Sequence, residues 1–193
     1  MDQTQAVGAN AKSHPLDVHP TKDALGAVIL HWFPIIADWA IRKKWMDLNS
    51  PRDPLGLLML VHTEQTELEQ AIAKNDLANV REEIADIAIR LIQMLAEHSL
   101  PVVSSDTRVA GLDIDASLSA AAEVWRNRTQ LGELVWRGKM SAEIIGAIEA
   151  LCRLHIGRIW DGSLGSIWYA LHMMIAEKMA INEGRAIRHG KDA

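Results

Sequence analysis

Residues 57–95, LLMLVHTEQTELEQAIAKNDLANVREEIADIAIRLIQML, decide the fold of this chain. Apolar residues recur every three or four positions on both sides of Asn75-Asp76, which is the spacing of two amphipathic helices separated by a turn. Asp76 is suited to cap the second helix. Because the connection is short, the two helices are expected to pack as antiparallel neighbours. The stretch therefore predicts a helical hairpin over about 54–74 and 77–98.

Acidic side chains occur in this hairpin at positions where helix packing alone does not require them. Glu64 and Glu67 lie on the first helix, and Glu83 and Asp86 on the second. Each pair is spaced i, i+3, so its carboxylates project from one helical face. Glu64 falls near the centre of the apolar stripe of its helix, where a carboxylate needs a compensating charge. Four such oxygen ligands suit a hard divalent cation, and the alternative is two ordinary acidic edges of amphipathic helices.

The rest of the chain also favours helices. Asp53-Pro54 supplies an N-cap and a residue suited to the first helical position of the hairpin. Pro34 is expected to kink or split the helix that contains it, and Ser141 is a candidate N-cap. Further helices are expected over about 21–46, 116–137, 141–156 and 166–183, with loops over about 101–113 and 157–165.

Composition narrows the class of protein. The chain has 193 residues, enough for one domain, and 49% of them are hydrophobic while only six are Pro, which favours an all-α protein. We predict a single all-α domain over residues 21–193, preceded by a flexible segment over residues 1–20.

The net charge of −5 argues against a nucleic-acid-binding surface. Cys152 is the single cysteine, which rules out an intrachain disulfide and fits a cytoplasmic protein. We expect no signal peptide and no membrane-spanning segment.

Two tryptophans and one arginine are further candidates. Trp32 and Trp39 are seven residues apart and therefore share a helical face. They are expected either to pack in the core or to form a wall on which a flat base stacks. Arg90 lies one turn from Asp86 and is expected in a structural ion pair, with a phosphate contact as the alternative.

The order Glu64-Gln-Thr-Glu67, then Glu83-Ile-Ala-Asp86, resembles the MazG-like family of all-α nucleoside triphosphate pyrophosphohydrolases, whose hallmark is ExxE followed by ExxD. The closing segment also resembles that of many members, with a K-x-x-x-N-x-x-R pattern and an R-H-G ending at Lys178, Asn182, Arg185 and 188–190. The resemblance covers roughly residues 55–98 and 168–191. About 90 residues lie between its two parts, more than in compact members, so residues 101–165 are expected to be an elaboration that adds a helical pair.

The resemblance implies an antiparallel helical bundle of the MazG-like type and a set of site residues. Glu64, Glu67, Glu83 and Asp86 would hold Mg²⁺, with Mn²⁺ as a possible substitute, and Glu67 is the candidate for orienting or deprotonating the attacking water. Substrate contacts are expected from Lys178, Asn182, Arg185, Trp32 and Trp39. The implied activity cleaves a nucleoside or deoxynucleoside triphosphate to the monophosphate and pyrophosphate, as nucleotide-pool house-cleaning. The implied partners are a small-molecule nucleotide and a second copy of the chain, as a homodimer or homotetramer.

Two other classes of protein compete with this interpretation. A di-iron carboxylate bundle normally draws Glu-x-x-His from two helices, and no Glu in this chain is followed three residues later by His. A non-catalytic helical interaction module, in which the acidic pairs are structural, is compatible with the sequence. Binding of Mg²⁺ or Mn²⁺ that depends on Glu64 and Glu83 separates the module from the enzyme.

Overall fold

The computed structural model describes residues 23–102, 113–160 and 164–184. Within these ranges the chain forms helices and no strand, which confirms the all-α class. The predicted flexible segment 1–20 lies outside the described residues. The helices are α1 (Asp23–Arg42), α2 (Pro54–Ala73), α3 (Leu77–Glu97), α4 (Ile114–Arg126), α5 (Arg128–Leu131), α6 (Glu133–Leu151), a π-helical turn η1 (Cys152–Ile156), α7 (Gly157–Ile159) and α8 (Leu164–Gly184).

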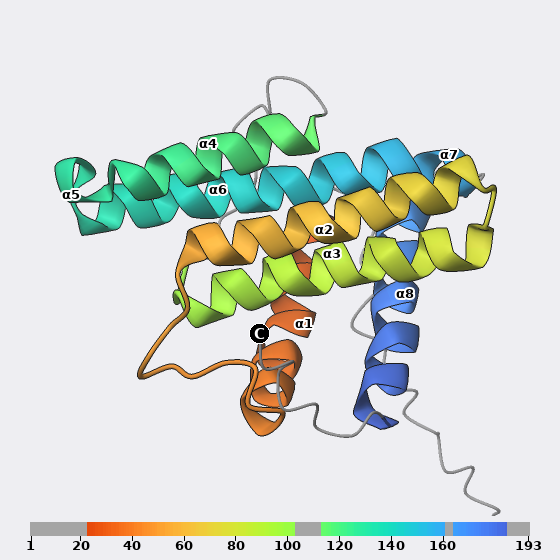
Figure 1. The fold of residues 1–193 in the computed structure, drawn as a ribbon, viewed down its shortest axis with the longest axis horizontal. Coiled ribbons are helices and arrows are strands. Elements are labelled where there is room, and N and C mark those ends of the chain that lie inside the picture. The colour runs from red at the N-terminus through yellow and green to blue at the C-terminus, as the bar shows by residue number, and fades with distance from the viewer. Residues whose placement is uncertain (1–22, 103–112, 161–163, 185–193) are drawn as a thin grey trace, which may run out of the picture.

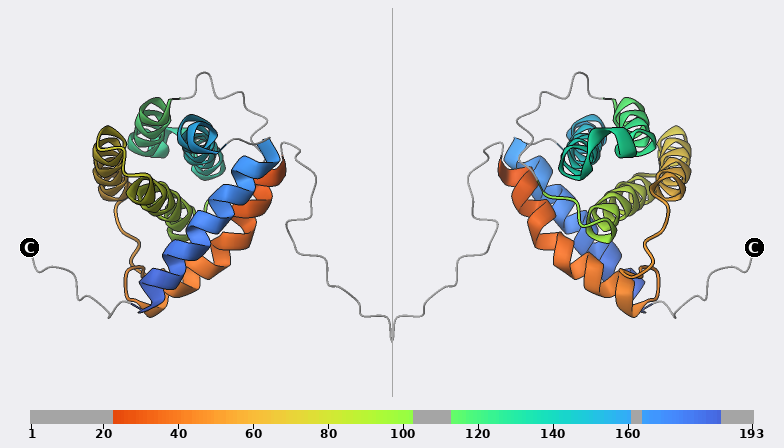
Figure 2. Two further views of the ribbon diagram at one scale, coloured as in Figure 1. Left: turned by 90° about the vertical axis from the view of Figure 1, so that its right-hand side faces the viewer. Right: turned by 90° about the vertical axis from the view of Figure 1, so that its left-hand side faces the viewer.

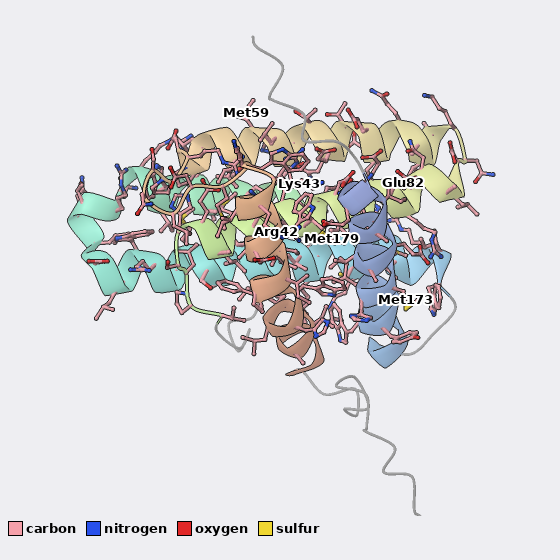
Figure 3. The ribbon with its side chains drawn as sticks, turned by 90° about the horizontal axis from the view of Figure 1, so that it is seen from below. Arg42, Lys43, Met59, Glu82, Met173 and Met179 are labelled. Atoms are coloured by element: carbon pink, nitrogen blue, oxygen red, sulfur yellow. The ribbon has the colours of Figure 1, made fainter. Side chains whose placement is uncertain are left out.

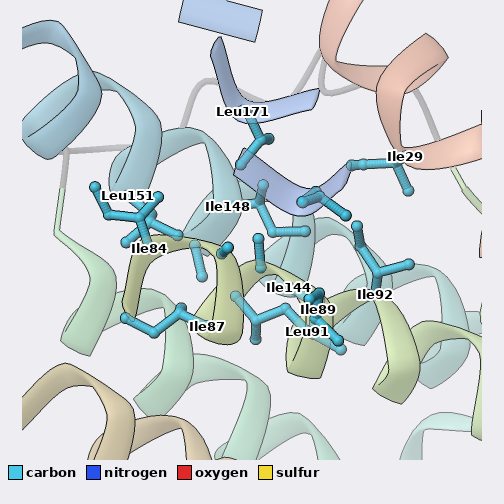
Figure 4. Packing of buried hydrophobic residues seen from close by; sticks show 14 of the residues in the cluster. Ile29, Ile84, Ile87, Ile89, Leu91, Ile92, Ile144, Ile148, Leu151 and Leu171 are labelled. Carbon is cyan, nitrogen blue, oxygen red and sulfur yellow. The ribbon is translucent and has the colours of Figure 1, made fainter. Parts of the chain in front are cut away.

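Helix α3 is the centre of the molecule and contacts α1, α2, α6 and α8. The pairs α2–α3 and α4–α6 run alongside one another, while α1 and α8 lie side by side across them (Figures 1 and 2). Neighbours therefore surround α3, and most of its residues are buried. Its isoleucines and leucines meet apolar residues of α1, α6 and α8 in the core (Figure 4). Such packing, rather than helix propensity, supplies most of the stability of helices this long.

The predicted hairpin of α2 and α3 is confirmed. Asp76 caps α3, because its carboxylate accepts a hydrogen bond from the backbone N–H of Asn79 at 3.2 Å. Pro54 begins α2 and Asp53 occupies the N-cap position, both as expected, but the carboxylate of Asp53 accepts no hydrogen bond from the first turn. It accepts instead from the indole N–H of Trp125 on α4, at 3.0 Å.

Helix α1 runs without interruption through Pro34, so of the two predicted effects of this proline the split does not occur, and the kink stays a prediction. The carbonyl that proline leaves unpaired belongs to Leu30, and both residues are exposed, so water can satisfy that carbonyl. The helix ends at Arg42, earlier than predicted. Lys44 adopts a positive φ of 59°, which ends the helix. The backbone N–H of Trp45 then donates a hydrogen bond to the carbonyl of Ala40, with 2.8 Å between nitrogen and oxygen.

The helices between residues 113 and 160 differ most from the prediction. The expected helix over 116–137 is broken at Asn127 and at Gly132, whose φ of 76° suits glycine. Helix α6 then continues through Gly138. Ser141 is not an N-cap but a buried residue inside α6, and its hydroxyl donates to the carbonyl of Pro101. The loop expected over 157–165 begins later than predicted, because η1 and α7 continue the helical structure to Ile159.

The part of α1 spanning Leu25–Arg42 is long and apolar enough to cross a membrane by length and composition, with a mean hydropathy of 1.3. In this fold 39% of that window is buried, and α1 packs on α3 and α8. A core helix passes the same test of length and composition. The expected absence of a membrane partner therefore stays a prediction.

Candidate functional site

Three of the four predicted acidic residues meet between α2 and α3. Glu64 from α2 and Glu83 and Asp86 from α3 each place a carboxylate oxygen so that the three oxygens lie within 4.8 Å of one another. The convergence follows from local structure, because residues i and i+3 of α3 face the same way and α2 runs alongside them. We call these three residues the carboxylate cluster.

Glu83 is the buried member of the carboxylate cluster. It is 7% exposed, and its Oε2 atom has no hydrogen-bond partner among the described residues. Burial raises the pKa of Glu83 to about 7, and the nearby charges of Asp86, Glu67 and Glu64 act in the same direction, while Lys178 opposes them. A buried carboxylate without a partner costs free energy unless a cation or a proton compensates its charge.

The other two members of the cluster have cationic partners. Arg90 pairs with Glu64 at 2.8 Å, so its predicted ion pair forms, although the partner is not Asp86. Lys178 of α8 lies 2.6 Å from Asp86 and 3.0 Å from Glu82. Burial works against the charge of Lys178, but hydrogen bonds and charges from Asp86 and Glu82 raise its pKa overall. The pKa of Asp86 is also raised, chiefly by burial, against the opposing effect of Lys178.

Glu67 is exposed, and it is not among the three residues whose oxygens converge. Its charge nevertheless contributes to the raised pKa of Glu83, so it lies close enough to affect the carboxylate cluster. The assignments of Glu67 as a metal ligand and as the residue that acts on water stay predictions.

The closing segment of the family pattern reaches the carboxylate cluster of its own chain. Lys178 is buried against Asp86, and Asn182, one turn further along α8, is also buried. Arg185 lies outside the described residues, so its predicted contact with substrate stays a prediction. Figure 3 shows α8 crossing α3 next to Glu82, which is the second partner of Lys178.

A cavity of about 200 Å³ adjoins the carboxylate cluster. Its lining comes from α2, α3, α8 and the end of α1, and consists of Trp39, Trp45, Glu64, Asp86, Ile89, Arg90, Gln93 and Asn182. The two indole rings meet edge to face with their centroids 4.7 Å apart.

The two predicted tryptophans have different surroundings. Trp39 is 1% exposed and lines the cavity, and its indole Nε1 has no hydrogen-bond partner among the described residues. Trp32 is not among the cavity residues. Its indole N–H donates to Nδ1 of His172 at 3.1 Å, in a cluster that also contains His31. Trp32 therefore packs between α1 and α8, and its role in binding a base stays a prediction.

Sequence reasoning missed three residues of this region. Glu82 lies one turn before Asp86 on α3 and shares Lys178 with it. Gln93 interrupts an apolar run, and a single polar residue within such a run is the sequence signal that could have identified it. Trp45 follows the end of α1, and no local pattern indicated that the chain turns there to place it beside Trp39.

The pKa of Glu83 predicts how the stability of the metal-free protein depends on pH. Its folded pKa of about 7 exceeds the ordinary value of 4.5, so the folded state holds the proton more tightly than the unfolded state. The stabilising contribution is complete below about 4.5 and is lost as the pH rises through about 7. We expect the free energy of unfolding to fall by on the order of 1–3 kcal/mol across this window.

Urea unfolding in the presence of a chelator, at about pH 5 and about pH 8, measures this change. The control is Glu83→Gln, which keeps the shape of the side chain but cannot titrate, so its stability should fall less over the same interval. Equal changes in both proteins would contradict the assignment of the raised pKa to Glu83.

The chain was compared with protein-family models, with curated proteins and with solved structures, and none of the three comparisons gave a match. The resemblance to the MazG-like family therefore rests on the motif residues themselves. Their geometry is what the functional proposal has to explain.

Proposed function

We propose that this protein is a Mg²⁺-dependent nucleoside triphosphate pyrophosphohydrolase of the MazG-like type, which releases a nucleoside monophosphate and pyrophosphate. The single observation that carries the proposal is the carboxylate cluster, in which the buried Oε2 of Glu83 lacks a partner among the described residues. Removal of surplus or noncanonical nucleotides in the cytoplasm, by a homodimer or homotetramer, is the cellular role that the family resemblance suggests.

The chemistry of the donor set fits a hard divalent cation. Glu64, Glu83 and Asp86 offer only carboxylate oxygens, which are the ligands that Mg²⁺ and Mn²⁺ accept. A cation would also compensate the buried charge of Glu83. When bound, Mg²⁺ supplies charge neutralisation at phosphate oxygens and lowers the pKa of coordinated water.

The cationic side chains have roles that follow from their contacts. Lys178 holds Asp86 and Glu82, which fixes the orientation of the Asp86 carboxylate towards the cluster. Arg90 does the same for Glu64 and also borders the cavity, where its guanidinium can contact phosphate oxygens. Asn182 also lines the cavity and can donate a hydrogen bond to a phosphate or a sugar. Glu67, at the exposed edge, is the candidate for orienting the attacking water.

The test is a panel of ribonucleoside and deoxyribonucleoside triphosphates incubated with Mg²⁺, with the products separated by ion-exchange chromatography. Monophosphate and pyrophosphate in equal amounts are expected, and a chelator should abolish their release. Release of orthophosphate as the first product would indicate a different phosphatase chemistry. No hydrolysis of any triphosphate, with either Mg²⁺ or Mn²⁺, would contradict the proposal.

A second candidate function has one observation in its favour. Two of the three clustered carboxylates, Glu64 and Asp86, already pair with Arg90 and Lys178. Such pairs also occur in a structural network, as in a non-catalytic helical interaction module. Isothermal titration with Mg²⁺ separates the two functions, because the module predicts no binding that depends on Glu64 and Glu83.

A further inference from the structure

We propose that the turn between α4 and α6 binds peripherally to membranes, by placing Leu134 and Val135 in the surface of a bilayer that contains anionic lipids. We call residues 126–139 the α5 tip. The inference goes beyond the proposed function and does not rest on it, because no residue of the α5 tip belongs to the carboxylate cluster or lines the cavity.

The α5 tip projects from the rest of the described structure. Figure 1 shows α5 at the free end of the α4–α6 pair, beyond the ends of α2 and α3, and Figure 3 shows the same arrangement from below. The local cause is a double break in the helix, because α4 ends at Arg126, α5 makes one turn, and Gly132 with a φ of 76° leads the chain into α6. The α5 tip can therefore reach a surface that α2 and α3 do not touch.

Leu134 and Val135 lie in the first turn of α6 with their side chains uncovered. Leu134 is 89% exposed, more than any other large hydrophobic side chain among the described residues, and Val135 is 50% exposed. A single exposed hydrophobic residue is ordinary, but here two neighbours occupy a projecting end, next to the partly exposed Trp136. Apolar side chains with an indole beside them suit the boundary between lipid headgroups and acyl chains.

The base of the α5 tip is fixed by its aromatic residues. The indole N–H of Trp125 donates to Asp53 at 3.0 Å, and the ring of Trp136 packs edge to face on that of Trp125, with the centroids 5.5 Å apart. The guanidinium carbon of Arg128 lies 3.8 Å from the centroid of the Trp125 ring. Because the α5 tip is already ordered, docking on a bilayer does not have to offset a large loss of conformational entropy.

The charge of the α5 tip is opposite to that of the whole protein. Residues 126–139 contain four cationic side chains and one acidic side chain, whereas the net charge of the chain is −5. Glu133 pairs with Arg137, while the exposed side chains of Arg126 and Lys139 form no ion pair with another described residue. An anionic bilayer attracts these cations and repels the acidic remainder of the protein. Charge therefore selects the α5 tip as the part that approaches such a bilayer.

The shape of the α5 tip fits a bilayer better than it fits a protein partner. A stable protein–protein interface buries about 800 Å² on each partner, which requires a broad face. The α5 tip instead offers a few apolar side chains at the end of a helix pair, which suits shallow insertion into a lipid surface. Binding of this kind changes the expectation, drawn from the sequence, of a protein without a membrane partner.

The experiment is co-sedimentation of the full-length protein with lipid vesicles, without nucleotide or metal. One set of vesicles is pure phosphatidylcholine, and the other is a mixture of phosphatidylcholine and phosphatidylserine. We expect the protein to sediment with the mixed vesicles and much less with the neutral ones. Binding should weaken when the salt concentration is raised from about 0.1 M to about 0.5 M, because salt screens the attraction between the cations and the lipid headgroups.

Two variants separate the apolar contribution from the electrostatic one. Leu134→Ser should weaken binding to the mixed vesicles about tenfold or more, because its side chain no longer gains from leaving water. Arg126→Gln combined with Lys139→Gln should weaken binding and reduce its dependence on salt. Met59→Ser is the matched control, since Met59 is 66% exposed on α2, outside the α5 tip, and its loss should leave binding unchanged. Circular dichroism checks that each variant keeps its helical content.

The unaltered protein provides a test that no variant can confuse. No sedimentation with the mixed vesicles would overturn the inference and leave a protein as the partner of the α5 tip. Equal binding to neutral and mixed vesicles would contradict the role of charge, and equal binding of Leu134→Ser and the unaltered protein would contradict insertion at Leu134. Because no triphosphate is present, these outcomes leave the proposed function to its own test.

Discussion

Glu83→Gln is expected to lower kcat/KM for pyrophosphate release roughly a hundredfold or more, and to weaken Mg²⁺ binding by a similar factor. Glutamine has the size and shape of glutamate, so the packing of α3 is kept. What changes is the charge of the one clustered carboxylate that is buried and unpartnered within the described structure. Steady-state kinetics with the best triphosphate and isothermal titration with Mg²⁺ measure the two effects.

A loss of activity through misfolding is distinguishable from a loss of the metal. Glu83→Gln removes an uncompensated buried charge, so the metal-free variant should be at least as stable as the unaltered protein above about pH 7. Glu69→Gln is the matched control, because it makes the same change on an exposed position of α2 outside the carboxylate cluster. It should keep full activity. Full activity in Glu83→Gln would show that Glu83 is not a required metal ligand.

Glu97→Ala is expected to reduce the free energy of unfolding by about 3–5 kcal/mol. The side chain of Glu97, at the end of α3, is 0% exposed. It accepts hydrogen bonds from the backbone N–H of Arg52 at 2.7 Å and from the guanidinium of Arg52, the shortest also 2.7 Å. Removing the carboxylate leaves a partly buried cation and a backbone donor without that partner. Urea unfolding followed by circular dichroism gives the change in stability.

Glu133→Ala tests whether burial is the cause of that loss. Glu133 forms an ion pair with Arg137 on α6, but its side chain is 72% exposed. Exposed pairs of this kind contribute about 0.2–1 kcal/mol, so this variant should be nearly as stable as the unaltered protein. Similar losses in the two variants would show that the Arg52–Glu97 pair gains nothing from its burial.

The sequence was informative where local pattern and tertiary packing agree. Periodicity and short connections predicted α2 and α3 as an antiparallel hairpin, and Asp76 caps α3 as expected. In the region after residue 113 the same reasoning placed helix ends at the wrong residues. The sequence predicted an interruption between residues 137 and 141, with Ser141 as an N-cap, yet Gly138 and Ser141 both lie inside α6. Local signals failed there because tertiary packing outweighs them. Ser141 is buried, and its hydroxyl donates a hydrogen bond to the carbonyl of Pro101, which is far away in the sequence.

Side chains within one helix can be related by spacing, and side chains from distant helices cannot. The i, i+3 rule placed Glu83 and Asp86 on one face, and the hairpin brought Glu64 to them. Nothing in the spacing indicated that Glu83 is buried while Glu67 is exposed. Glu83 lies on α3, which α1, α2, α6 and α8 contact, whereas Glu67 lies on α2, whose main contacts are with α3 and α4.

By itself, the sequence determined that this is an all-α protein with a helical hairpin whose acidic residues face one another. Only the tertiary structure decided which carboxylate is buried, which cations neutralise the others, and that Trp39, Gln93 and Asn182 line a single cavity. The physical reason is that burial and electrostatic fields depend on every helix packed around a group. Here α8 brings Lys178 to Asp86, and α1 brings Trp39 to the cavity that Asp86 also lines.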